Sequence, residues 1–242
     1  MEKAYKLLAL QEGISNRAAK DLIDRGVVYS GGKKVTVARG ELSDSVNFKV
    51  EKIADIKTLF EDDMIVAVDK PAFVTSEEVA LQMNLPLLHR LDKETSGVLL
   101  LTKDDAFRKK AVEAFKKKEV HKEYIAIVES RIAEEVTINA PILTIKKGNT
   151  AYSKISDDGK EAISIVTPLM VEGKRTKVKV VIETGRTHQI RVHLRSIGAS
   201  IQGDTEYGGR PFKRLMLHAS KIALLGYTFT CPEPTDFKRF VL

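Results

Sequence analysis

The sequence contains almost no cysteine. Cys231 is the single cysteine among 242 residues, which excludes an internal disulfide and any zinc cluster built on cysteines. Its surroundings, TFTCPEPTDF, offer no neighbouring base or cation that would lower the pKa of the thiol and make it reactive. We therefore predict that Cys231 is a structural residue.

Long hydrophobic runs are also missing. No stretch approaches the roughly 18 consecutive apolar residues of a membrane helix. The first residues, MEKAYKLLALQEG, interleave charges with their apolar side chains, unlike a secretory signal. We expect a cytoplasmic protein with no membrane partner.

Several short motifs of familiar chemistries are absent. There is no GxGxxG, and GVVYSGGKK misses a phosphate-binding P-loop because Gly32 stands where the lysine belongs. His188 and His193 are five residues apart without an HExxH frame, so a zinc site is not expected. These absences exclude nucleotide hydrolysis and leave no metal implied.

Positive charge is what the chain does have. The net charge is +7 and the pI is about 9.3, which favours a polyanionic partner, although charge alone shifts the odds only about twofold. With 43% hydrophobic and 30% charged residues, the composition is that of a soluble globular protein able to bury a sizeable core.

The first fifty residues form a separate unit. In SNRAAKDLIDRG, apolar residues at 18, 19, 22 and 23 mark one helical face, with Ser15 as N-cap and Gly26 as C-terminal cap. VVYSGGKKVTV then sets two β-branched runs around a Ser-Gly-Gly turn, which predicts a hairpin. We place the boundary in EKIADIKTLFEDD, giving domains 1–52 and 53–242. Basic side chains expected at the solvent side of the first domain are Arg17, Lys20, Arg25, Lys33 and Lys34.

The second domain alternates strand-like and helix-like stretches. GVLLLTK predicts a buried strand, DDAFRKKAVEAFKKK an amphipathic helix with Asp104 at its start, and EYIAIVES another strand. In TKVKVVIET, valine and isoleucine alternate with lysine, as in a half-exposed antiparallel strand. The predicted class is α+β.

The stretch ETGRTHQIRVHLRSIG predicts a further helix, capped by Thr187 and ended by Gly198. At about 100° per residue, two groups fall on opposite sides: the apolar Ile190, Leu194 and Ile197, and the cationic His188, Arg191 and Arg195. One face should therefore pack on the core and the other be cationic. A surface helix with solvated arginines explains this stretch alone equally well.

Asp92 raises the main question of the sequence. In LLHRLDKETSGVLLLTK it lies between Arg90 and Lys93, and TSG ends the turn before a buried strand. Taken alone, the commoner fate of such an aspartate is an N-cap or a turn residue. Whether Asp92 is such a turn residue or a functional one depends on the motifs found elsewhere in the chain.

Five segments, in this order and spacing, resemble the successive signature motifs of the RluA-type pseudouridine synthases. They are HRLDKETSGVLLL, HKEYIAIV, TGRTHQIRVHL, GDTEYGG and LHAS, and the match runs from about residue 60 to the carboxyl end. SNRAAKDLIDRGVVYSGGKKV resembles the small S-four RNA-binding domain often fused ahead of such a catalytic domain. The resemblance implies a small amino-terminal α/β domain followed by a catalytic domain with a largely antiparallel mixed sheet and flanking helices.

The resemblance also implies a reaction. Uridine within RNA becomes its C-glycoside isomer: the N1–C1′ bond breaks, the uracil turns, and C5 bonds to C1′. Nothing is added or removed, so the implied chemistry needs no cofactor and no metal, and it uses one nucleophilic carboxylate. The target uridine must leave its helical stack. Attack at C1′, attack at C6 and a glycal intermediate all remain open.

Carried over by motif, Asp92 is the nucleophile and Arg191 its ion-pair partner. Tyr124 stacks on the base and helps to move the C5 proton, while Arg90 holds the flipped nucleotide and its phosphate. Further residues expected to contact RNA are His89, Thr95, Arg186, His188, Gln189 and Leu217, and, in the first domain, Arg17, Lys20, Arg25 and Lys33.

The expected partner is structured RNA. Large-subunit ribosomal RNA is favoured because an appended binding domain suits a large structured RNA, and transfer RNA is the alternative. A non-catalytic RNA-binding factor of ribosome assembly is a second function class, against which the joint presence of Asp92, Tyr124 and Arg191 argues. We expect a monomer.

Overall fold

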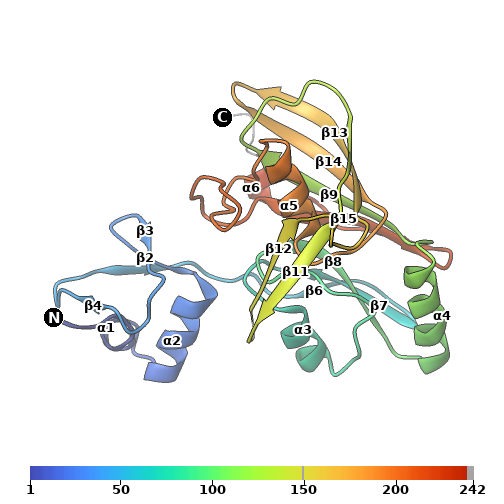
Figure 1. Ribbon diagram of the computed structural model, residues 1–242. Helices are drawn as coiled ribbons and strands as arrows, with labels where there is room; N and C mark the ends of the chain where they lie inside the picture. The colour runs from blue at the N-terminus through green and yellow to red at the C-terminus, as the bar shows by residue number, and fades with distance from the viewer. Residues whose placement is uncertain (149, 239–242) are drawn as a thin grey trace. The chain divides into compact units, whose positions relative to one another are not determined.

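The computed structural model describes residues 1–148 and 150–238. The chain divides into two compact units, Met1–Asp55 and Ile56–Leu242, with a boundary close to the one placed between residues 52 and 53. Figure 1 labels most of the elements of both units.

The first unit contains two helices and two small sheets. Its elements are β1 (Glu2–Lys3), α1 (Ala4–Glu12), α2 (Asn16–Arg25), β2 (Val28–Ser30), β3 (Lys33–Lys34), β4 (Glu41–Leu42) and β5 (Phe48–Val50). The Ser15 side chain accepts a hydrogen bond from the Ala18 amide (3.1 Å), and Gly26 adopts the left-handed conformation at φ 79°. Both caps are as predicted, as is the antiparallel β2–β3 hairpin, which β5 extends.

Four basic residues of this unit were predicted to contact RNA. Arg17 and Lys33 are exposed. Lys20 Nζ lies 4.2 Å from the centroid of the Tyr5 ring, and Arg25 Nε lies 2.6 Å from Asp21 Oδ2. The latter two side chains thus have partners within the unit, and RNA contact by all four stays a prediction.

The second unit is built on one nine-stranded sheet in the order β10-β13-β14-β9-β15-β8-β7-β6, with β16 paired to β15. The strands are β6 (Lys57–Glu61), β7 (Ile65–Lys70), β8 (Ser96–Thr102), β9 (His121–Val128), β10 (Val136–Asn139), β13 (Ile163–Glu172), β14 (Arg175–Ile182), β15 (Leu217–Leu224) and β16 (Tyr227–Thr230). All neighbours are antiparallel except β15 and β8, which are parallel. This is the predicted α+β architecture with a largely antiparallel mixed sheet.

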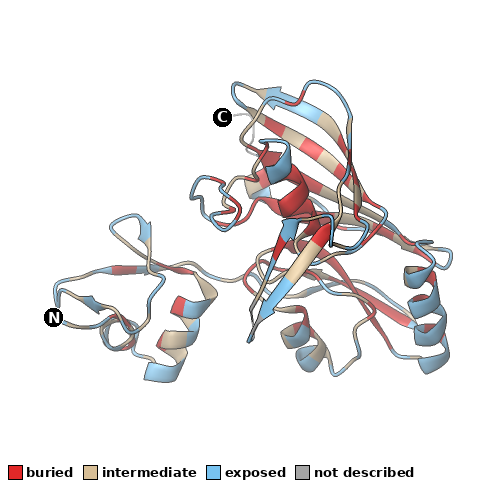
Figure 2. Ribbon diagram, in the orientation of Figure 1, coloured by how far each residue is buried: buried red, intermediate tan, exposed pale blue. Residues whose placement is uncertain are grey.

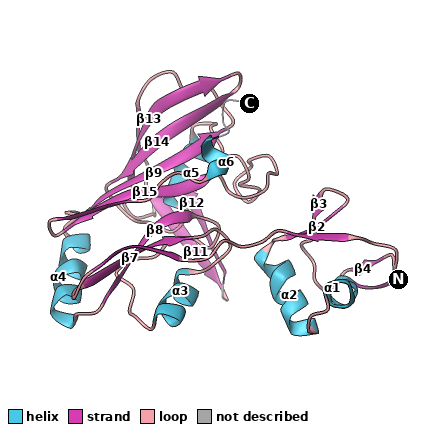
Figure 3. Ribbon diagram, turned by 180° about the vertical axis from the view of Figure 1, so that it is seen from behind, coloured by secondary structure: helices cyan, strands magenta, loops and turns pink. Residues whose placement is uncertain are grey.

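Helices and a separate hairpin accompany this sheet (Figure 3). They are α3 (Ser76–Met83), α4 (Asp105–Lys116), α5 (Gln189–Ser196) and α6 (Thr235–Lys238), with the hairpin of β11 (Ile142–Lys147) and β12 (Thr150–Ile155). The Asp104 side chain caps α4 by accepting a hydrogen bond from the Phe107 amide, as predicted. Among the described residues, no helix has the length and apolar character needed to cross a membrane.

The core of the second unit has two large clusters and a small one around Tyr207; buried residues are red in Figure 2. In one large cluster, the predicted strand β8 is buried throughout and packs with β7 and the apolar face of α4, which presents Phe107 and Ala111. In the other, Ile190 and Leu194 of α5 pack on β9 and β14. Burial alternates along β14 as predicted. Cys231 is buried in the first of these clusters, and burial raises the pKa of its thiol, so its structural role is confirmed.

Gly97 lies where strands β8 and β15 approach each other closely. It pairs with Ala219 where β8 and β15 run parallel, and a Cβ at this position would lie 2.2 Å from the Ala219 carbonyl oxygen. Its φ of +119° is also one that other residues rarely adopt. The glycine of the TSG segment therefore permits close strand approach directly after the loop that carries Asp92.

Candidate active site

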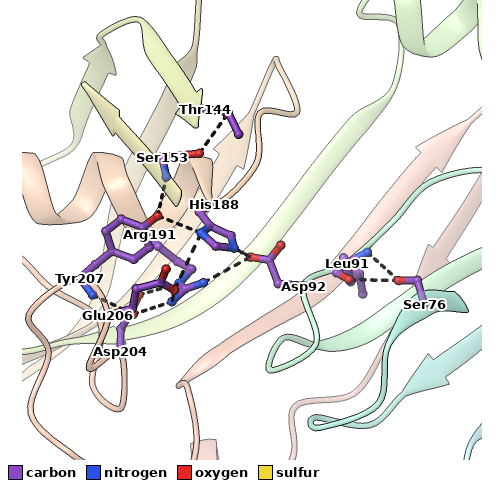
Figure 4. A network of polar contacts seen from close by, with 10 residues as sticks. All are labelled: Ser76, Leu91, Asp92, Thr144, Ser153, His188, Arg191, Asp204, Glu206 and Tyr207. Atoms are coloured by element: carbon purple, nitrogen blue, oxygen red, sulfur yellow. Dashed lines mark hydrogen bonds and ion pairs between the residues drawn. The ribbon is translucent and has the colours of Figure 1, made fainter. Parts of the chain in front are cut away.

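The Asp92 loop is anchored through its backbone. The buried Ser76 hydroxyl of α3 accepts a hydrogen bond from the Leu91 amide (2.9 Å) and donates one to the Leu91 carbonyl (3.0 Å), as Figure 4 shows. The Thr95 amide donates to the Asp92 carbonyl (3.1 Å). The turn therefore uses the backbone of Asp92, and its carboxylate points toward α5 instead of capping the turn.

Lys70 also anchors the Asp92 loop through hydrogen bonds to backbone carbonyls. Its fully buried Nζ donates to the carbonyls of Pro71 (2.9 Å), Val74 (2.7 Å) and Lys93 (3.3 Å). Burial lowers the pKa of Lys70 to about 7, an effect that the nearby Asp92 charge partly offsets. The end of β7 is thus tied to the residue that follows Asp92.

The lowered pKa of Lys70 predicts a pH effect on stability. Between about pH 7 and the ordinary lysine pKa of 10.5, the unfolded chain binds more protons at this side chain than the folded chain. The free energy of unfolding should therefore rise with pH in this window, by roughly 1 kcal/mol per pH unit from this group. We expect Lys70→Met to be less stable than the wild type, because the carbonyls around Nζ lose their hydrogen-bond donor, and to lack this rise.

Denaturant titrations at pH 7.5 and pH 9.5 measure the difference. The exposed Lys109→Met is the matched control and should keep the pH dependence of the wild type. Identical pH slopes for the wild type and Lys70→Met would contradict the effect.

Helix α5 begins differently from the prediction. Its N-cap is His188, at φ 54°, and no side chain caps it, so the assignment of Thr187 was wrong. The buried Gln189 side chain secures this turn: its carbonyl accepts from the Thr184 hydroxyl (2.7 Å) and the Arg186 amide (3.0 Å), and its amide donates to the Ile163 carbonyl (2.9 Å). These hydrogen bonds give Gln189 a structural role at the start of α5, and its contact with RNA stays a prediction.

The two predicted faces of α5 are also partly wrong. Arg191 is only 5% exposed, whereas Ile197 is 38% exposed. The periodicity missed this because residues 197–216 fold over the cationic side and bring a buried acid, Asp204, against it. Arg195 is exposed as expected.

Arg191 is the centre of a cluster of carboxylates (Figure 4). Its Nε and Nη2 donate to the two oxygens of Asp204 at 2.8 and 2.7 Å, and Nη2 also donates to Glu206 Oε2 at 2.8 Å. Nη1 lies 3.9 Å from Asp92 Oδ2. Burial alone would lower the pKa of Arg191, but hydrogen bonds and charge from Asp204, with Asp92 and Glu206, raise it overall. Arg191 is thus a permanent positive charge. It forms two hydrogen bonds with Asp204 and a longer ion pair with Asp92.

His188 connects this cluster to Tyr207. Its Nε2 lies 4.0 Å from Asp92 Oδ2, and its Nδ1 lies 2.8 Å from the Tyr207 hydroxyl oxygen and 4.0 Å from Glu206 Oε2. The guanidinium carbon of Arg191 lies 4.7 Å from the centroid of the Tyr207 ring. Burial raises the pKa of Tyr207 to about 12, so its hydroxyl remains protonated at neutral pH.

Tyr124 belongs to the same region. It pairs with Val180 and Ala219 within the central sheet. Burial raises the pKa of its hydroxyl, and the negative charge of Asp92 raises it further. The phenol is therefore neutral, and it lies close enough to Asp92 for the two groups to interact electrostatically. The side chain of Asp92 is 31% exposed, so this carboxylate of the cluster is reachable from solvent.

Two of the residues predicted to contact RNA have partners within the protein. His89 Nε2 accepts a hydrogen bond from the Leu100 amide (3.2 Å), and its half-buried ring packs on Phe115. Burial lowers the pKa of His89 to about 4, so the ring is neutral and available as this acceptor. Leu217 is 3% exposed at the start of β15 and packs in the core. RNA contact by His89 and Leu217 stays a prediction.

The remaining predicted residues lie around the cluster. Arg90 is exposed, with Nε 2.8 Å from Glu77 Oε1. Arg186 Nε donates to the Glu161 carbonyl (2.8 Å), and Thr95 is buried in the Asp92 loop. The sequence reasoning assigned no role to Lys70, Asp204, Glu206 or Tyr207, although the last three lie in the GDTEYGG segment that carried the resemblance.

The chain is similar to several known proteins. Residues 65–196 match the family described as RNA pseudouridylate synthase. An uncharacterized RNA pseudouridine synthase of Helicobacter pylori strain J99 is 54% identical over 242 residues, covering 98% of this chain and 100% of the relative. The ribosomal large subunit pseudouridine synthase C of Rickettsia prowazekii is 35% identical over 196 residues, covering 72% of this chain and 65% of the relative.

A solved structure agrees as well. Human RNA pseudouridylate synthase domain containing 1 superposes with a TM-score of 0.65 at 26% identity, covering 74% of this chain and 84% of that one. The family match alone spans more than half of the chain. The chain therefore belongs to the RNA pseudouridylate synthase family, as its RluA-type motifs predict.

Proposed function

We propose that this enzyme converts specific uridines of large-subunit ribosomal RNA to pseudouridine, with Asp92 as the nucleophile. One observation carries the proposal: a partly exposed carboxylate lies 3.9 Å from a buried arginine whose charge is fixed by a second, buried acid. A nucleophilic carboxylate has to be ionised in a site that closes over a base, and a permanent cation beside it favours that state.

The surrounding residues suit the other steps of the isomerisation. Asp204 occupies two of the donors of Arg191, which leaves Nη1 directed at Asp92. Tyr124 supplies a neutral aromatic ring for stacking on the uracil once the nucleotide has left its helix. Arg90, exposed at the start of the loop, is placed to meet a phosphate.

The choice of ribosomal RNA rests on relatives. The Rickettsia protein and a Xanthomonas campestris protein, 28% identical over 227 residues, are named ribosomal large subunit pseudouridine synthases C and D. Transfer RNA is the alternative substrate. A non-catalytic assembly factor is disfavoured, because a purely structural role gives no reason to hold Asp92, Tyr124 and Arg191 in one cluster.

Unmodified transcripts test the proposal. The purified chain is incubated separately with large-subunit ribosomal RNA and with a transfer RNA pool, both transcribed in vitro, and pseudouridine is quantified in each. We expect pseudouridine at a few positions of the ribosomal transcript. Pseudouridine in transfer RNA alone would show that transfer RNA is the substrate. Pseudouridine in neither RNA would support a non-catalytic role.

We also propose that the first unit is an S-four-like RNA-binding domain. If it supplies mainly phosphate interactions, removing residues 1–55 should weaken binding to long RNA while turnover at saturation persists. The salt dependence of binding should become shallower, by about one unit of slope for each phosphate that the truncated protein no longer neutralises.

A full-length variant controls for misfolding in this experiment. Changing Arg17 and Lys33, both exposed, to Gln should produce part of the same loss of affinity and slope. A folded truncation whose affinity and slope equal those of the full chain would show that the first unit does not anchor RNA.

A further inference from the structure

The β11–β12 hairpin carries an aromatic side chain that the proposed reaction does not use. Tyr152 pairs across the hairpin with Ile145, and the two residues are 45% and 47% exposed. Lys154, exposed as well, lies two residues after Tyr152 and so on the same face of the hairpin. A large ring and an aliphatic side chain thus meet solvent beside a cationic residue.

The Tyr152 ring is held against the active site. It stacks on Tyr207 with centroids 5.3 Å apart and planes inclined by 11°. The Tyr207 hydroxyl accepts a hydrogen bond from the Ser153 amide (2.9 Å) and contacts His188 Nδ1 (2.8 Å). Figure 4 shows Ser153 and Thr144 of the hairpin beside Tyr207 and His188. The Tyr207 ring is therefore the one side chain between Tyr152 and the groups around Asp92, namely His188 and Arg191.

Stacking positions the Tyr152 side chain. Within residues 1–148 and 150–238, its only ring contact is Tyr207, and its hydroxyl forms no hydrogen bond. One side of the ring is covered and nearly half of the side chain remains exposed. Such a fixed, sequence-tolerant stacking surface beside basic residues is how proteins hold unpaired bases.

We propose that Tyr152 is a stacking platform for an unpaired RNA base that neighbours the target uridine. The inference rests on the proposed function, because flipping a uridine out of its stack deprives its neighbours of a stacking partner. A ring beside the pocket takes the place of that partner and so lowers the cost of flipping. Lys154, two residues along the strand and therefore on the same face as Tyr152, can then meet a phosphate of the same nucleotides.

A single tryptophan tests the contact directly. The chain has no tryptophan, so Tyr152→Trp introduces one fluorophore at the platform. Titration with an unmodified transcript of large-subunit ribosomal RNA should quench its emission. Val112→Trp, at a 40% exposed position of α4, is the matched control for absorption by the RNA. Equal quenching of the two variants, or none in Tyr152→Trp at saturation, would overturn the proposal.

Steady-state kinetics separate the platform from a merely supporting role. Tyr152→Leu keeps apolar volume but loses the aromatic face, so KM should rise on the order of tenfold, with a smaller change in kcat. Tyr152→Phe keeps the ring and should restore KM. A loss of kcat at unchanged KM would mean that Tyr152 only supports Tyr207, and unchanged kinetics in Tyr152→Leu would also overturn the proposal.

Further outcomes distinguish failure of the proposed function from failure of the stacking proposal. Absence of pseudouridine with the wild-type enzyme would refute the proposed function, while the fluorescence titration would still report stacking. Quenching of Tyr152→Trp by a protein from the ribosomal fraction, and not by RNA, would reassign the hairpin to protein docking and overturn the platform.

Discussion

Asp92→Asn is expected to reduce pseudouridine formation to background while RNA affinity stays within about a factor of ten. Asparagine keeps the volume and hydrogen-bonding capacity of the side chain but cannot act as the carboxylate nucleophile. The backbone anchors of the loop, made by Ser76 and Thr95, do not involve the carboxylate. The fold should therefore be unaffected, and only chemistry should be lost.

Single-turnover assays with excess enzyme measure this effect, with RNA affinity determined on the same preparations. Glu94→Gln, two residues along the same loop, is a control for a change of charge. Substantial isomerisation by Asp92→Asn would sink the nucleophile assignment. A large loss with Glu94→Gln would attribute the effect to loop charge in general.

Arg191→Met is expected to lower turnover by orders of magnitude, and Arg191→Lys to recover only part of it. A guanidinium can grip Asp204 with two parallel hydrogen bonds and still present Nη1 to Asp92, whereas an ammonium is a point charge without that fork. Arg195→Met should cost far less, because Arg195 is exposed and its described hydrogen bond is to the Tyr207 carbonyl.

Arg191→Met should also reduce stability. Asp204 is only 1% exposed, and removing its partner leaves a buried charge uncompensated, at a typical cost of about 3–5 kcal/mol. Turnover therefore has to be expressed per folded molecule, with denaturant titration in parallel. Pairing Arg191→Met with Asp204→Asn should recover stability but not turnover. Recovery of both would show that Arg191 acts only through the fold.

Local chemistry made much of the fold predictable. Ser15 and Gly26 delimit α2 because a cap depends on a few neighbouring residues, and the valine–lysine alternation of β14 reports directly which face is buried. The α5 helix shows where this reasoning stops. Its own sequence cannot reveal that Asp204, contributed by a later loop, will bury Arg191.

The candidate site was predictable to the same degree. The Asp92–Arg191 pair follows from the resemblance, and the structure places the two groups 3.9 Å apart. Lys70 could not be assigned, because its role depends on backbone carbonyls from two segments. The backbone hydrogen bonds of His89 and Gln189 were not foreseen for a related reason: a sequence does not show which polar side chains near a site bind the protein's own backbone.

Pseudouridine mapping in cells tests whether this chain modifies large-subunit ribosomal RNA through Asp92, as we propose. Total RNA is mapped from cells with the gene, from cells without it, and from deletion cells expressing either the wild-type protein or Asp92→Asn. We expect specific sites in large-subunit ribosomal RNA to disappear on deletion, to return with the wild-type protein and not to return with Asp92→Asn. Return of those sites with Asp92→Asn, or loss of sites only in transfer RNA, would contradict the proposal.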